Sequence, residues 1–88
     1  MKKEIQLLKA LADETRLKIV RFLLKGEKCV CEIYPHIKRT QSTTSIQLDV
    51  LRKAGIVKSK RKGKKVYYFI ADDKVSDVLK SLGLLKNN

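Results

Sequence analysis

At 88 residues with a formal net charge of +12, the chain is long enough for one small domain and leaves no room for a second core. Its apolar runs stay well short of the ~18 residues of a membrane span, and its amphipathic beginning argues against a secretory signal, so we expect a cytoplasmic protein without a membrane partner. The 21 lysines and arginines against 9 aspartates and glutamates indicate a polyanionic partner, for which nucleic acid is the best candidate.

The helical spacing of apolar residues predicts three helices in the first part of the chain. The first covers residues 3–11. The second begins after Asp13, a good N-cap, and ends at Gly26. A short third helix is expected at residues 30–38. Because proline is tolerated in the first turn of a helix, we expect Pro35 near that turn or a distortion at its position.

The rest of the chain predicts a helix, a hairpin and a last helix. Thr40 can cap a fourth helix at residues 41–54. A strand–turn–strand pattern follows over residues 56–70, with Gly63 supplying the turn. A final amphipathic helix is expected at residues 73–85. The predicted order is therefore α-α-α-α-β-β-α.

These elements together predict a winged helix-turn-helix, a mainly α fold with a small β-hairpin, in one domain over residues 1–88. The helix-turn-helix core would cover about 30–54 and the wing about 56–70. The helices at 3–11 and 73–85 have apolar stripes without an obvious place in a three-helix core. We therefore expect these two helices to pack against a second copy of the chain, and the alternative is that they fold back on their own domain.

The fourth helix has a polar face that suits a DNA major groove. Placing Thr44, Leu48 and Leu51 inward leaves small hydrogen-bonding side chains on the outside. Glutamine can pair with adenine, and serine can contact either a base or a phosphate. We predict DNA contacts from Gln41, Ser42, Thr43, Ser45 and Gln47.

The hairpin is strongly basic, with six lysines and arginines within residues 58–65. A run of charge is usually only a solvated face, but here it lies at a hairpin tip beside a candidate recognition helix, where it can hold phosphates. If three side chains per protomer reach phosphates, a dimer would show a log–log salt slope of about −5. We predict phosphate contacts from Lys60, Arg61, Lys62, Lys64 and Lys65.

Two cysteines lie in one Cys29-Val30-Cys31 triplet. Residues two apart on an intact helix point about 200° apart, so this pair could hold one ion only where the first turn is extended. Two thiolates would suit a thiophilic ion such as As(III) or a soft divalent metal ion, with His36 as a candidate third ligand. The alternatives are buried filler and a redox pair, for which we expect a disulfide between protomers more readily than within the triplet.

Four ordered stretches of the chain share a family resemblance. They are residues 8–19, residues 27–33 around the cysteines, residues 41–45 with 48–57, and Gly63, Val66, Tyr67 and Tyr68 of the hairpin. They resemble, in turn, the opening box, the metal box, the recognition helix and the wing of the ArsR/SmtB family of winged-helix repressors. The resemblance implies a homodimer joined by the first and last helices, operator binding that blocks transcription, and release by a metal or another inducer.

Three positions depart from that family's pattern. Ile46 stands where the family usually has arginine or histidine, and Asp49 where it often has a basic residue. We therefore expect the fourth helix to read bases modestly and the wing to supply much of the affinity. Tyr34 stands where the family's arsenic sensors often place a third cysteine.

The sequence therefore predicts a homodimeric, sequence-specific double-stranded DNA-binding repressor, released by a thiophilic metal or metalloid at Cys29 and Cys31. The alternative is a small basic nucleic-acid-binding protein that is non-specific or redox-gated and senses no metal. We do not expect an enzyme, because the chain has no phosphate-cradling glycine loop and no built pair of nucleophile and base.

Overall fold

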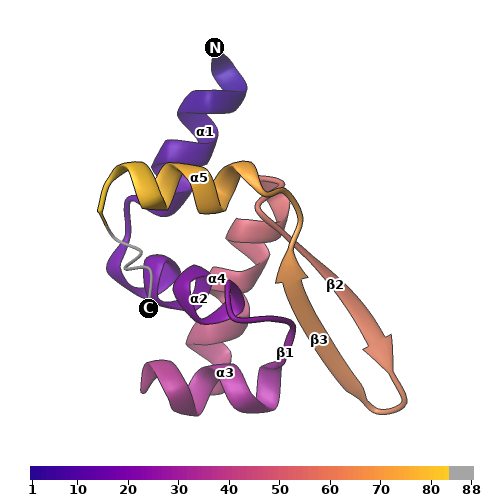
Figure 1. The fold of residues 1–88 in the computed structure, drawn as a ribbon. Coiled ribbons are helices and arrows are strands. Elements are labelled where there is room, and N and C mark those ends of the chain that lie inside the picture. The colour runs from indigo at the N-terminus through magenta and orange to yellow at the C-terminus, as the bar shows by residue number, and fades with distance from the viewer. Residues whose placement is uncertain (84–88) are drawn as a thin grey trace.

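Over residues 1–83, which the computed structural model describes, a helical body carries a β-hairpin that projects away from it (Figure 1). The elements are α1 (Lys2–Leu11), α2 (Glu14–Leu23), β1 (Lys28–Cys29), α3 (Val30–Ile37), α4 (Gln41–Lys53), β2 (Val57–Lys62), β3 (Lys65–Ile70) and α5 (Lys74–Ser81). The N-terminus lies at the far end of α1, which extends out of the body (Figure 1).

The predicted helix starts are confirmed by their capping hydrogen bonds. The Asp13 carboxylate accepts a hydrogen bond from the Arg16 N–H at 3.0 Å, and the Thr40 hydroxyl accepts one from the Thr43 N–H at 3.1 Å. Each cap satisfies one of the N–H groups that the first turn of a helix leaves without a partner. α2 ends at Leu23, slightly earlier than expected, and Gly26 follows in the turn with a φ of 133°.

Pro35 does not lie near the first turn, which was the first of the two alternatives expected for it. α3 begins at Val30, so Pro35 is its sixth residue and lies in the last turn rather than the first. The helix stops two residues later, and Lys38 takes the left-handed conformation, with a φ of 58° and a ψ of 48°. The left-handed residue turns the chain out of α3 and toward the start of α4.

The predicted element order also missed a strand. β1 pairs with β3 in antiparallel register, Lys28 opposite Tyr68 and Cys29 opposite Tyr67, and the strand order of the sheet is β1-β3-β2. Two residues are too few to show an alternating pattern, so no sequence signal marked them. As a result, Cys29 is hydrogen-bonded into the same sheet as the hairpin.

The core is formed by apolar side chains from all five helices of the described chain and from the start of β2. Its largest fully buried members are Ile19, Val20, Ile33, Leu48, Leu51, Ile56, Val57, Val75 and Leu79. The first and last helices also contribute to the core of their own domain, α1 through Leu11 and α5 through Val75 and Leu79. Across residues 1–83, every helix is too short or too polar to pass through a lipid bilayer.

The outer sides of α1 and α5 keep large apolar side chains in contact with solvent. Ile5 is 44% exposed, Leu8 52% and Leu82 63%. α5 ends at Ser81, before the predicted residue 85. Gly83 follows with a φ of 72°, and positions 84 and 85 of the predicted helix lie outside the described residues.

One buried polar atom offers a test of the packing. Thr44 is fully buried on the inner side of α4, and its hydroxyl oxygen has no hydrogen-bond partner among the described residues. Because an unsatisfied buried hydroxyl costs free energy, Thr44→Val should raise the free energy of unfolding by about 1 kcal/mol in urea denaturation. Thr43→Val, at a half-buried position on the same helix, is the matched control. A loss of stability in Thr44→Val alone would show that its hydroxyl has a partner.

Candidate nucleic-acid interface

The hairpin sorts its basic side chains onto two faces. Lys62 lies opposite Lys65, Lys60 opposite Tyr67 and Lys58 opposite Phe69, and residues directly opposite each other in an antiparallel pair share a face. Arg61 lies opposite Val66, on the other face. The turn has two residues, Gly63 and Lys64, and Gly63 has a φ of 63°, which glycine adopts without strain.

Two lysines of the hairpin are already paired inside the protein. Glu27, just before β1, forms ion pairs with both lysines. One of its carboxylate oxygens lies 3.1 Å from Lys60 Nζ, and the other lies 3.2 Å from Lys62 Nζ. These ammonium groups also lie over aromatic rings, Lys60 at 5.4 Å from the Phe69 centroid and Lys62 at 5.0 Å from that of Tyr67. The hydrogen bonds from Lys60 and then Lys62 lower the pKa of Glu27, so it is ionised at neutral pH and offsets part of their charge.

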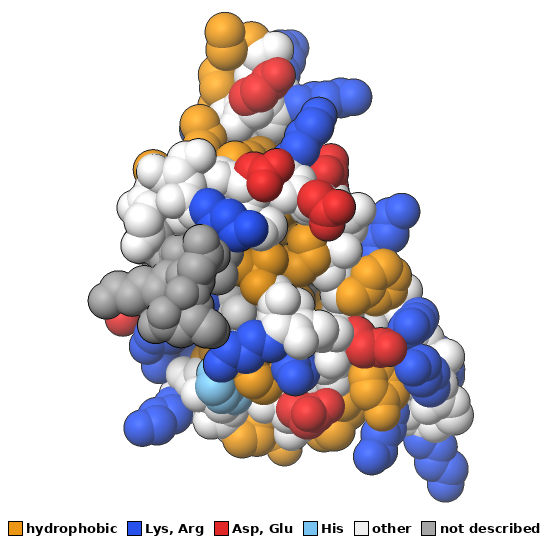
Figure 2. Space-filling view, viewed as in Figure 1, with side chains coloured by type: hydrophobic (Ala, Val, Ile, Leu, Met, Phe, Trp, Pro, Cys, Tyr) orange, Lys and Arg blue, Asp and Glu red, His pale blue; other side chains and the backbone are white. Residues whose placement is uncertain are grey.

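The other basic side chains of the hairpin point into solvent. Lys58, Arg61, Lys64 and Lys65 are exposed and form no ion pair with any residue among 1–83. Lys and Arg side chains gather along the hairpin in Figure 2. The end of the wing is therefore a region of uncompensated positive charge, suited to phosphates.

α4 presents the polar face that the sequence predicted. Thr44, Leu48 and Leu51 are fully buried, which confirms the inward stripe. Gln41, Ser42 and Ser45 are exposed, and Thr43 is half-buried. Ile46 is 63% exposed, so an apolar side chain stands among these polar ones. α4 is in contact with β2, so the recognition helix and the base of the wing are neighbours in the fold.

Asp49 does not present a free negative charge on this face. Its carboxylate accepts from Arg52 at 2.6 Å and pairs with Lys53 at 3.1 Å, one turn further along α4. The hydrogen bonds from Arg52 and then Lys53 lower the pKa of Asp49. Its charge is thus offset within the helix, which reduces the repulsion that a lone carboxylate would exert on DNA.

Gln47 differs from the other predicted contact residues. It is half-buried, and its Oε1 accepts a hydrogen bond from Arg16 Nη1 at 2.8 Å. The side chain is therefore turned toward the junction of α1 and α2. Its amide oxygen is engaged inside the protein.

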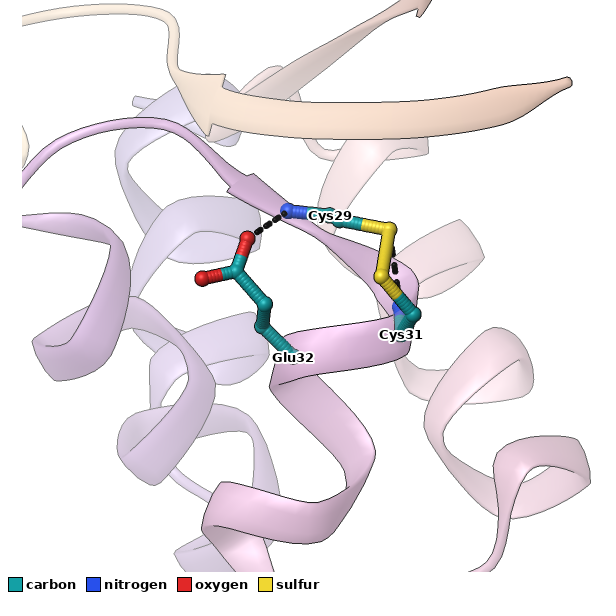
Figure 3. Close-up of a disulfide and its surroundings, with 3 residues drawn as sticks. All are labelled: Cys29, Cys31 and Glu32. Carbon is teal, nitrogen blue, oxygen red and sulfur yellow. Dashed lines mark hydrogen bonds between the residues drawn. A yellow bond between two sulfur atoms is a disulfide. The ribbon is translucent and has the colours of Figure 1, made fainter.

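The two cysteines meet where β1 passes into α3 (Figure 3). Cys29 is the extended N-cap, with a φ of −68° and a ψ of 146°, and Cys31 lies in the first turn. The structure joins them by a disulfide, and the Cys31 N–H donates to Cys29 Sγ at 3.1 Å. The Glu32 carboxylate accepts from the Cys29 N–H at 3.0 Å.

The two sulfur atoms meet here because Cys29 is extended, as expected for residues two apart. The expectation against a bridge within the triplet is wrong, because Cys29 lies outside the helix and its side chain can turn toward Cys31. Cys29 is 3% exposed and Cys31 is open to solvent. The pair is therefore reachable from one side only.

His36 does not join the cysteines. Its ring stacks on that of Phe22 with the centroids 3.8 Å apart. Lys28 Nζ lies over the same Phe22 ring, 5.0 Å from its centroid. No cluster of three or more histidine, cysteine, aspartate or glutamate side chains in residues 1–83 could hold a metal ion. The structure therefore places the His36 ring against Phe22 and not beside the two sulfurs. The described part of the chain offers two sulfurs and leaves any further ligand to come from outside it.

Comparisons with known proteins identify the family. Residues 13–59 match the model of the family described as "Bacterial regulatory protein, arsR family". The chain belongs to this family.

An uncharacterized HTH-type transcriptional regulator of Methanocaldococcus jannaschii is 42% identical over 89% of the chain and 89% of its own length. The cadmium resistance transcriptional regulatory protein CadC of Listeria innocua is 46% identical over 81% of the chain, which spans 60% of that protein. A homodimeric winged helix-turn-helix DNA-binding domain from Mycobacterium bovis superposes with a TM-score of 0.87 at 30% identity, covering 94% of this chain and 77% of that one.

These findings confirm the predicted ArsR/SmtB resemblance and the winged helix-turn-helix fold. They place the chain among DNA-binding transcription regulators rather than enzymes. The individual DNA contacts and the domain limits remain predictions.

Two residues of this ArsR-family interface went unnoticed in the sequence. Glu27 comes just before the cysteines, and only the tertiary pairing of β1 with β3 brings it to the hairpin. Arg16 lies within a helical stripe, and nothing in its spacing marks a contact with Gln47, 31 residues away. A single sequence does not show that an acidic residue lies close in space to a run of basic residues, so no signal could have revealed these contacts.

Removing the carboxylate that holds two wing lysines should strengthen DNA binding. Glu27→Gln frees Lys60 and Lys62 for phosphates, and each new contact should steepen the log–log salt slope by about 0.9. We expect severalfold tighter binding of random duplex DNA in a titration at several salt concentrations. Glu14→Gln removes the same charge from α2, where it pairs with Lys18 at 3.5 Å, and is the matched control. Equal slopes in both variants would mean that Glu27 does not compete with DNA.

Proposed function

We propose that two copies of this ArsR-family chain bind one double-stranded operator in the cytoplasm and repress transcription by occupying it. The observation that supports this most directly is the pairing of two features on one rigid body. One is the polar outer face of α4, and the other is the wing, with three uncompensated cations near its tip (Arg61, Lys64 and Lys65) and a fourth, Lys58, near its base. A helix in the major groove specifies sequence, while a basic wing on the flanking backbone adds affinity and sets the register.

The exposed apolar side chains of α1 and α5 support a dimer. Ile5, Leu8 and Leu82 would leave solvent if these helices packed against a second copy. The related M. bovis domain is described as homodimeric. A two-fold dimer presents two α4 helices, so the operator would be a palindrome with half-site centres about 34 Å apart.

A salt series on the operator tests this function. The wild type should bind a palindrome from its own promoter region far more tightly than random duplex DNA, as two chains per duplex and with a log–log slope of about −5. Lys64→Gln should reduce the steepness of that slope by about 2, because a dimer loses two phosphate contacts. Lys80→Gln, which removes the same charge from α5, should leave the slope unchanged. Equal affinity for operator and random DNA at physiological salt would refute sequence-specific repression.

The position of the sulfur pair, which connects to both parts of the DNA interface, supports a role as a control point. Cys29 is paired with Tyr67 of the wing, and Cys31 lies in the first turn of α3, the helix that packs against α4. In the reduced chain, two thiolates on the same side would bind a soft ion such as As(III) or Cd²⁺, and water or a small thiol would complete its shell. Such an ion would release DNA if it prefers a geometry of β1 and α3 that the DNA-bound state does not allow.

Variants of the sulfur pair test this control. Arsenite, Cd²⁺ and Zn²⁺ are titrated into operator complexes of the reduced wild type and of the double variant Cys29→Ser/Cys31→Ser. Arsenite or Cd²⁺ should weaken operator binding at least tenfold in the wild type and not in the variant. Cys29→Ser alone keeps one thiol and should lose most of the response. An equal response of the wild type and the double variant would show that the ions act elsewhere.

The disulfide favours a second candidate, in which an oxidant acts at the same two residues. Oxidation removes two electrons and two protons from the thiols and joins the two sulfurs, while the oxidant takes up the electrons. The wild type and the double variant Cys29→Ser/Cys31→Ser also distinguish control by a metal ion from control by oxidation. If metal-free wild type releases operator on treatment with diamide and rebinds with dithiothreitol, while the double variant does neither, the switch is redox-driven. Release by ions alone supports the metal.

A further inference from the structure

We infer that Arg16 is a positioning residue that fastens the recognition helix α4 to the end of α1, and that Gln47 serves this fastening rather than base reading. This inference rests on the proposed function and assigns Gln47 a different role from the base contact that the sequence suggested. Three contacts of one guanidinium group carry it.

The first contacts are with the C-terminal end of α1. Arg16 Nε donates to the Ala10 carbonyl at 2.6 Å, and Nη2 donates to the Lys9 carbonyl at 3.5 Å. The Ala10 carbonyl is one of the last carbonyls of α1, which a helix leaves without a partner of its own, whereas the Lys9 carbonyl also accepts from the Ala12 N–H at 3.2 Å. A positive charge is favoured at this end of the helix dipole. The Arg16 guanidinium therefore caps α1 from the neighbouring helix.

The remaining contact is with α4. Arg16 Nη1 donates to Gln47 Oε1 at 2.8 Å. Arginine has only donors, so the oxygen and not the nitrogen of the Gln47 amide must face it. A glutamine that reads adenine points its oxygen and its nitrogen together at the base edge. Here Arg16 fixes the Gln47 amide toward the junction of α1 and α2, with one lone pair of its oxygen already in use.

Side-chain packing between α1 and α4 does not make the connection that Arg16 makes. An open groove of about 300 Å³ lies between Lys9 and Ala10 of α1 and Val50 and Ala54 of α4, with Arg16 in its wall. The backbone N–H of Arg16 is itself held by Asp13 at the start of α2. One residue thus ties together the end of α1, the beginning of α2 and the middle of α4.

The consequence concerns the spacing of the two recognition helices. In the proposed dimer, the partner subunit sets the direction of α1, and Arg16 transmits that direction to α4. Removing the link should therefore weaken binding to a full palindrome more than binding to a single half-site. It should not change which base is preferred at any position.

A double-mutant cycle tests the link without depending on DNA. Gln47→Met keeps the size and helix preference of the side chain and removes the acceptor, and Arg16→Lys keeps the charge and removes the fork. In urea unfolding, the two substitutions together should cost clearly less than the sum of the two single losses. Additive losses would overturn the inference whatever the protein binds. Ser45→Ala, on the opposite side of α4, should be additive with Arg16→Lys.

Operator binding then tests the role. Gln47→Met should weaken binding to the palindrome about tenfold and binding to a half-site within about threefold. It should show the same relative preferences as the wild type across single base-pair changes. A loss of preference at one base pair would make Gln47 a base reader and overturn the positioning role. If the wild type shows no operator preference, the proposed function fails, while coupling in urea still reports on the link itself.

Discussion

The burial of one stripe of α4 governs the rest of the interface. Once Thr44, Leu48 and Leu51 are enclosed by the core, the 100° step of the helix directs every other side chain. Ser42 and Ile46 then face outward, Ser45 lies on one flank and Gln47 on the other. The two flanks meet different surroundings, and only the Gln47 flank faces the junction with α1 and α2. The helix thus has one surface for DNA and one for its own scaffold.

The charge of the chain is likewise divided by the fold. A net charge of +12 describes the attraction of the whole chain to a polyanion, but the carboxylates determine where that attraction acts. Glu27 offsets Lys60 and Lys62 on one face of the wing, and Asp49 is offset by its own neighbours on α4. Lys58, Arg61, Lys64 and Lys65 keep their charge uncompensated among the described residues. Glu27 lies two residues before Cys29, so its ion pairs connect the wing to the segment that carries the sulfur pair.

The sequence was informative where a signal is local and periodic. The caps at Asp13 and Thr40, the inward stripe of α4 and the turn at Gly63 depend on residues within one or two turns of each other, and all of them were predicted. The two-residue strand β1 was not, because it owes its existence to pairing with a strand almost 40 residues away. The position of Pro35 within its helix was predicted wrongly. The helix ends at Ile37, where Lys38 turns left-handed, so the proline falls in the last turn, and the sequence pattern did not show this end.

The sequence by itself determined the kind of protein: a small, basic winged helix whose polar helix and charged hairpin suit DNA. Composition and short-range spacing are enough for this, since helix faces and hairpins follow from the local chain. Only the tertiary structure decided which of those side chains are free. Gln47 accepts a hydrogen bond from Arg16, and Glu27 pairs with both Lys60 and Lys62. His36 stacks on Phe22, and the two cysteines are joined to each other. Apart from the cysteines, each partner comes from another element of the fold, and a hydrogen bond or ion pair across such a distance leaves no periodic trace in one sequence.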